Sequence, residues 1–79
     1  PISCEFYDEL EAISTLRKKV EIEYTEESGV NSIISDKIIN LYNREKIEYL
    51  VLESGQEIRL DRLQKVDGKK LSDYESCDL

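Results

Sequence analysis

The chain opens with one segment of helical periodicity, and most apolar residues after it gather in short strand-like segments separated by turns. At about 100° per residue, Phe6, Leu10 and Ile13 fall on one stripe of a helix. Acids near the start of this segment and bases at 17–19 suit the two ends of a helix dipole. We therefore expect a helix over 5–17, followed by a mainly β fold.

The strand-like segments begin where Val20, Ile22 and Tyr24 alternate with polar residues, as in a strand with one face in water. Residues 30–42 are rich in isoleucine, but two isoleucine doublets break the alternation. This pattern predicts a bent or bulged strand, which is how a small sheet curls toward closure. The remaining strands are expected at 47–52, 57–60 and 63–66.

About five short, bent antiparallel strands behind one helix describe a small barrel, of either the Sm-like or the OB type. The position of the helix favours the Sm-like type, because an OB barrel more often has its helix between the third and fourth strands. We expect all 79 residues to form one Sm-like domain. It comprises the helix, a barrel over 18–67 and a frayed C-terminal tail over 68–79, part of which Leu71 and Tyr74 could anchor.

Opposite the apolar stripe, Tyr7, Asp8 and Glu11 share an arc of roughly 100° on the helix surface. The helix carries no base before Arg17. This face is therefore predicted to be a charged docking surface, with Tyr7 outside the core.

The net charge of −7 argues against binding of a nucleic-acid backbone by the chain itself. Nucleic-acid binders normally present a basic patch that displaces counterions. A basic protein partner fits the charge better. The alternative is that the charge only keeps a small domain soluble.

Residue types used for catalysis are sparse. The chain has no histidine and no glycine-rich phosphate loop, and its serines lie beside no obvious base. Asp8 and Glu11 have the i,i+3 spacing of a general acid/base pair or a cation site, but an exposed helix face offers them no supporting groups. We expect no enzymatic activity, no cofactor and no metal site.

The two cysteines, Cys4 and Cys77, cannot build a zinc site without histidines. We expect both thiols to be free in a cytoplasmic protein, although a bridge could form in an oxidising compartment. No apolar run approaches the roughly 20 residues that span a bilayer, so we expect no membrane segment.

Three segments together resemble the Rho-binding antiterminator family, Rof. The family pattern P-I-x-C-x-x-Y-D-x-L-E matches residues 1–11. The pattern V-E-Y-L-V-x-E is similar to 47–53, where Ile47 replaces the valine, and a strand ending R-L-D-K-I is similar to 59–63, which reads R-L-D-R-L. Between residues 29 and 43 little is shared beyond Ser35 and Asp36.

This resemblance implies a bacterial, cytosolic protein with an Sm-like barrel that inhibits transcription termination. It implies binding to the N-terminal, nucleic-acid-binding region of the Rho helicase, which blocks RNA loading without binding RNA, and we expect a monomer when free. Tyr7, Asp8 and Glu11 match the helix positions that dock on Rho. Arg44 and Lys46 correspond to a basic turn that also contacts Rho, although Glu45 interrupts that turn here.

Two other classes of function stay open. The first is an RNA-binding Sm-like module whose bases converge on one face, namely Lys37, Arg59, Arg62, Lys65, Lys69 and Lys70. The second is a structural subunit that closes a ring through its edge strands. Titration with single-stranded RNA tests the first, and light scattering tests the second.

Overall fold

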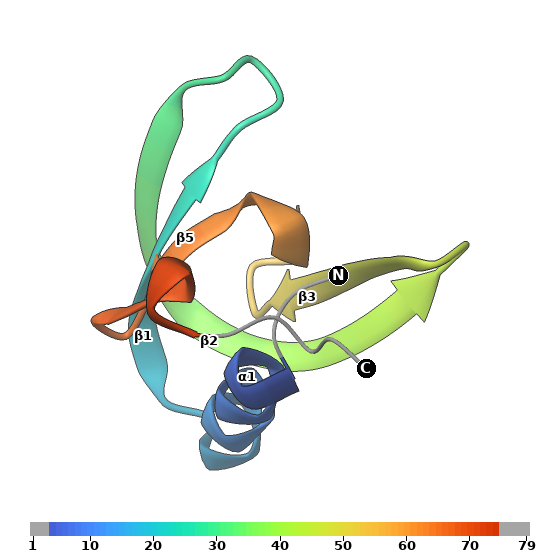
Figure 1. Cartoon of the computed structure of the whole chain (residues 1–79). Coiled ribbons are helices and arrows are strands. Elements are labelled where there is room, and N and C mark those ends of the chain that lie inside the picture. Colours follow the sequence, from blue (N-terminus) through green and yellow to red (C-terminus); the bar gives the residue numbers. More distant parts are fainter. Residues whose placement is uncertain (1–3, 75–79) are drawn as a thin grey trace.

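The computed structural model describes residues 4–74, in which one helix is followed by six strands (Figure 1). The helix is α1 (Cys4–Leu16), and two 3₁₀ turns are η1 (Leu60–Arg62) and η2 (Leu71–Asp73). The strands are β1 (Lys19–Thr25), β2 (Asn31–Arg44), β3 (Ile47–Leu52), β4 (Glu57–Arg59), β5 (Leu63–Val66) and β6 (Lys69–Lys70). The prediction of a mainly β fold behind one N-terminal helix is confirmed.

The strands form one antiparallel sheet in the order β4-β3-β2-β1-β5-β6. Over the described residues the sheet curls strongly but does not close, because β4 and β6 are its two ends. The fold is therefore barrel-like, with six strands where about five were expected.

The long strand β2 makes the curl possible. Its first half pairs with β1 and its second half pairs with β3, so that one strand belongs to both halves of the sheet (Figure 1). The register with β3 shifts between Ile38 and Asn40, at the second isoleucine doublet. An irregularity of this kind bends the strand and increases its twist. The bent strand predicted over 30–42 is confirmed.

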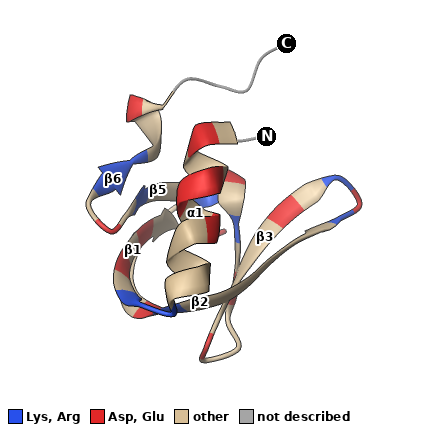
Figure 2. Cartoon of the chain, turned by 90° about the horizontal axis from the view of Figure 1, so that it is seen from below, with Lys and Arg blue, Asp and Glu red and all other residues tan. Residues whose placement is uncertain are grey.

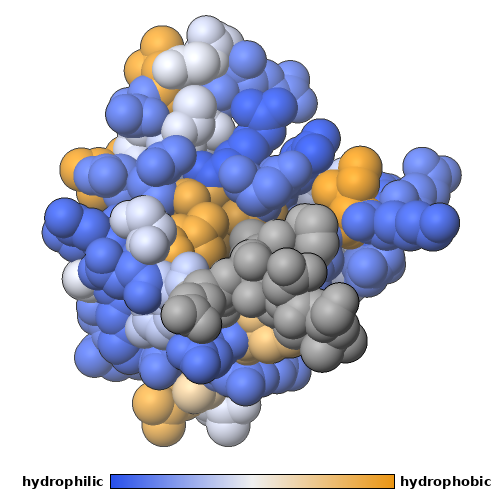
Figure 3. Space-filling view, in the orientation of Figure 1, coloured by the Kyte–Doolittle hydropathy of each residue, from blue (hydrophilic) through white to orange (hydrophobic). Residues whose placement is uncertain are grey.

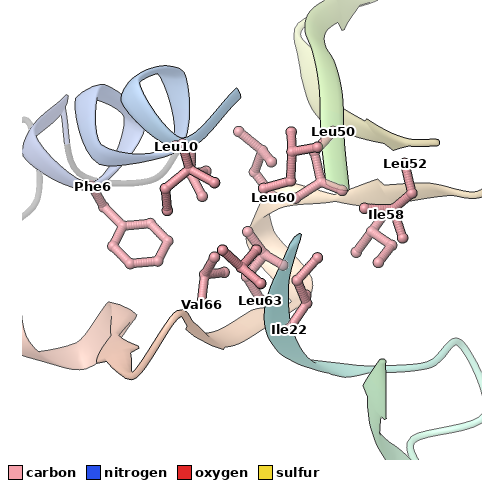
Figure 4. Packing of buried hydrophobic residues seen from close by; sticks show 12 residues of the cluster. Phe6, Leu10, Ile22, Leu50, Leu52, Ile58, Leu60, Leu63 and Val66 are labelled. Atoms are coloured by element: carbon pink, nitrogen blue, oxygen red, sulfur yellow. The ribbon is translucent and has the colours of Figure 1, made fainter. Parts of the chain in front are cut away.

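The core lies between the helix and the concave side of the sheet. Figure 4 shows Phe6 and Leu10 pointing from α1 into the space where buried side chains of β1, β3, β4, η1 and β5 meet. Ile22, Leu50 and Leu52 are fully buried there. The helix is therefore held by its apolar stripe, and its opposite face is left for other contacts.

The C-terminal part of the described chain is more ordered than a frayed tail. Residues 69–73 form β6 and η2, and Leu71 and Tyr74 pack against the core. The ring of Tyr74 meets that of Phe6 edge to face, with the centroids 5.1 Å apart. Residues 75–79 of the expected tail lie outside the described residues.

Cys4 is disulfide-bonded rather than free, which corrects the expectation of a free thiol at this position. Cys77 lies outside the described residues. Between residues 4 and 74, no helix is long and apolar enough to cross a membrane.

Candidate functional site

The helix α1 presents two chemically distinct faces, as its periodicity predicts. Phe6, Leu10 and Ile13 are buried, with at most 5% of each exposed. Asp8 and Glu11 are exposed on the other side. Because three buried side chains anchor the helix, the two carboxylates project from a rigid support.

Tyr7 lies at the boundary between these faces rather than wholly outside the core. It is half-buried and packs against the core cluster, which corrects the expectation from the helical arc alone. Burial raises the pKa of its hydroxyl, and the carboxylates of Glu11 and Glu48 raise it further. The neutral phenol is therefore a hydrogen-bonding group next to two negative charges.

Glu48 belongs to this surface, although sequence reasoning did not single it out. It is the second residue of β3 and is half-buried. Side chains alternate between the faces of a strand, so Glu48 points to the same side as the fully buried Leu50 and Leu52. In the sequence, the signal for Glu48 was its position as an acid in the alternating series with Leu50 and Leu52, whose other members are apolar and face inward.

The acids of α1 differ in how far the protein itself neutralises them. The Glu9 carboxylate is 2.6 Å from Nζ of Lys69 on β6, and this hydrogen bond raises the pKa of Lys69. Asp8 and Glu11 form no ion pair with any residue between 4 and 74. Their charge is thus available to a partner.

Arg44 and Lys46 lie at the β2–β3 hairpin, where Arg44 pairs with Ile47 across the strands. Glu45 and Lys46 are the two turn residues between Arg44 and Ile47, and their φ angles are 54° and 69°. Two positive φ values are the signature of a type I′ turn, which normally takes Asn and Gly. The backbone N–H of Lys46 donates to Oδ1 of Asn43 at 3.2 Å, which helps to hold the turn.

This turn gives a prediction for stability. Replacing Glu45 by Asn together with Lys46→Gly should raise the free energy of unfolding by about 1–2 kcal/mol, because left-handed backbone is costly for ordinary L-residues. Urea unfolding measures the change. Glu45→Gln is the control, since it removes the charge but keeps the strain. An unchanged midpoint for the double variant would contradict the turn assignment.

Three side chains form a stack beside this turn, on one face of the hairpin. The ring centroids of Tyr42 and Tyr49 are 5.2 Å apart, and the angle between the ring planes is 17°. The two tyrosines pair directly across β2 and β3. The guanidinium carbon of Arg44 lies 5.8 Å from the Tyr42 centroid and 5.5 Å from that of Tyr49. The hydroxyl of Tyr42 donates to the Glu57 carboxylate, which raises the pKa of that hydroxyl.

The predicted site residues thus form two groups. Figure 2 shows the acids of α1 on the helix in front of β2, with the bases of the hairpin at the tip to one side. The fold brings Glu48 of β3 near Tyr7. Glu48 pairs with Asn43, next to the Arg44–Ile47 pair, so Arg44 is close to Glu48 along the hairpin but points to its opposite face. The candidate site therefore comprises an acidic helix face and a basic turn at the β2–β3 hairpin.

The surface offers little apolar area for docking. Figure 3 shows a face that is mostly hydrophilic and interrupted by apolar areas. Among the described residues, the large hydrophobic side chains that are exposed belong to Leu16, Val30 and Ile33, on separate elements or loops.

A groove of about 420 Å³ lies between the end of β1 and β4. It contains Arg59 and Arg62, but also Glu26, Glu27 and Glu57. The Arg59 guanidinium is 2.6 Å from the Asp61 carboxylate. The groove is therefore of mixed charge and gives no basic channel for a phosphate backbone.

The bases considered for RNA binding come from five different elements of the described chain. Arg59 and Arg62 line the groove, Lys37 lies in β2, and Lys65 pairs with Lys70 at the β5–β6 edge. Lys69 is bound by Glu9. This distribution gives less support to an RNA-binding module than to a protein-binding surface.

Among residues 4–74, no group of three or more histidine, cysteine, aspartate or glutamate side chains could hold a metal ion.

Comparison with known proteins adds one finding. A family model described as "modulator of Rho-dependent transcription termination (ROF)" matches residues 1–73. No curated protein matches the chain, and no solved structure matches it. The match covers the helix, all six strands and the hairpin, and it confirms the resemblance carried by residues 1–11, 47–53 and 59–63.

Proposed function

The chain belongs to the ROF family of modulators of Rho-dependent transcription termination, and from this we propose that it binds the N-terminal, RNA-binding region of Rho and blocks RNA loading. The observation that carries the proposal is the helix face. There Asp8 and Glu11 are exposed and form no ion pair within residues 4–74, beside the half-buried Tyr7. A modulator that binds Rho through this face would inhibit termination.

The chemistry of such a contact is complementary. Proteins bind single-stranded nucleic acid with a positively charged groove and aromatic stacking residues. Carboxylates on a rigid helix pair with those same bases through charge-assisted hydrogen bonds. Tyr7 supplies a contact of a type enriched at the centres of interfaces, and Glu48 extends the acidic surface next to it. The protein then occupies the place of RNA.

In this proposal the protein acts by binding Rho and not as an enzyme, and it needs no cofactor. It acts in the cytoplasm, where Rho acts, and it is a monomer when free. It does not bind RNA itself, because its charge of −7 and its scattered bases disfavour a polyanion. Light scattering measures the oligomeric state of the free protein, and a stable ring would favour the alternative function as a ring-forming structural subunit.

Binding to Rho should weaken as salt rises and as RNA occupies the same region, because the contact pairs acids of this protein with bases of Rho. Fluorescence anisotropy with the Rho N-terminal domain measures the first effect, and competition with oligocytidine measures the second. A ternary complex of Rho, this protein and oligocytidine bound at Rho's primary site would exclude direct competition. Tight binding of RNA by this protein alone at low salt would contradict the proposal and favour the RNA-binding alternative.

A further inference from the structure

The guanidinium of Arg44 is held by aromatic rings, in contrast to three bases that are held by acids. Lys18, Arg59 and Lys69 are each paired with a carboxylate of the same chain. Arg44 forms no ion pair with any residue from 4 to 74, and its guanidinium lies over two tyrosine rings instead. Its N–H groups therefore remain available to an acceptor from outside.

The two tyrosines make a preorganised support for this guanidinium. Tyr42 and Arg44 are two residues apart in β2 and thus point to the same face, and Tyr49 lies opposite Tyr42 in β3. The Tyr42 hydroxyl is fixed by Glu57 of β4, so three strands determine the ring positions. An aromatic face attracts a cation but leaves its hydrogen-bond donors unused.

We propose that Tyr42 and Tyr49 are positioning residues that hold Arg44 to bind one carboxylate of the partner protein. This inference rests on the proposed function. The resemblance already implies that the turn of Arg44 and Lys46 contacts Rho, and the inference assigns the acceptor of Arg44 and the two residues that hold it. The partner surface must then present an acid at a distance from the bases that meet Asp8 and Glu11. Two contacts of opposite sign fix the orientation of the protein on its partner, because a rotated arrangement would place like charges together.

A carboxylate fits this site better than a nucleic-acid backbone. A guanidinium binds a carboxylate through two parallel hydrogen bonds, and one such group adds only a single negative charge. A polyanion would also meet Glu45 in the turn and Glu57 beside Tyr42, within a chain of charge −7. These acids repel a row of phosphates more strongly than they repel a single carboxylate.

A double-mutant cycle within this chain tests the positioning role. Arg44→Ala should weaken binding to the Rho N-terminal domain about tenfold, as expected for loss of a charged hydrogen bond. Tyr42→Leu should weaken it about threefold through Arg44, and should have no further effect when Arg44 is already Ala. If Tyr42→Leu lowers the affinity of the Arg44→Ala protein for Rho by the same factor, the positioning role is wrong. Urea midpoints show that each variant is folded, and Tyr42→Phe is the control that keeps the ring.

The identity of the acceptor is tested by charge exchange. Arg44→Glu should bind poorly to Rho, and replacing one Asp or Glu of the Rho N-terminal domain by Lys should restore its binding. Restoration by none of these replacements would overturn the carboxylate assignment. If the unaltered protein binds labelled oligocytidine and Arg44→Ala does not, the acceptor of Arg44 is a phosphate and the carboxylate assignment is wrong. If the unaltered protein does not bind Rho, the proposed function fails. If it binds and Arg44→Ala binds equally well, only this inference fails.

Discussion

Changing Asp8 or Glu11 to Lys should leave the fold intact and reduce binding to Rho by about two orders of magnitude or more. Each change removes an attraction and places a like charge against the basic groups of Rho, and such juxtaposition costs several kcal/mol. Both side chains are exposed and unpaired within residues 4–74, so the free energy of unfolding should change little. Anisotropy with the Rho N-terminal domain and a termination assay measure the loss.

The matched control is Glu27→Lys, which changes the net charge equally. Glu27 is exposed in the β1–β2 hairpin, and that hairpin projects on the side of the sheet away from α1 (Figure 1). Glu26 is less suitable because its carboxylate accepts a hydrogen bond from Ser32. If Glu27→Lys reduces inhibition of Rho as much as Asp8→Lys does, bulk charge drives binding and the helix face has no special role.

Tyr7 needs two variants, because its ring also packs against the core. Tyr7→Ala should weaken binding but should also lower the urea midpoint, since it removes a half-buried ring. Tyr7→Phe keeps the ring and removes only the hydroxyl. Its effect on affinity at an unchanged midpoint isolates the hydrogen bond of the phenol.

The second large effect is on stability. Leu50→Ala or Leu52→Ala should lower the free energy of unfolding by about 2–5 kcal/mol, because each removes a fully buried side chain and leaves a cavity. A domain of this size has only a few kcal/mol to lose. Both leucines lie on the inner face of β3, so either variant should be partly unfolded at room temperature.

Val51 provides the control on the same strand. It lies between the two leucines, faces the other side of the sheet and is half-buried. Val51→Ala should cost no more than about 1 kcal/mol. Equal urea midpoints for Leu50→Ala and Val51→Ala would contradict the placement of β3 at the centre of the fold.

The amino-acid pattern alone determined those parts of the protein that depend on local periodicity. The stripe of Phe6, Leu10 and Ile13 predicted the buried face of the helix, and the second of the two isoleucine doublets in 30–42 marked the bend of β2. Both features follow from the geometry of one element, 3.6 residues per turn or two per repeat, and need no knowledge of its neighbours. The resemblance to the family likewise rested on short motifs, and the family match over residues 1–73 confirms it.

Tertiary structure decided which residues from different elements meet. No local period could place Glu48 of β3 beside Tyr7, or show that Lys69 pairs with Glu9 while Asp8 and Glu11 form no ion pair within residues 4–74. The same holds for the sheet that stays open between β4 and β6, and for Tyr74, which packs on Phe6 across most of the chain. Arg44 lies over two tyrosines because strand register pairs Tyr42 with Tyr49. Register and packing are set by the whole core at once, so these contacts exist only when all the strands are in place.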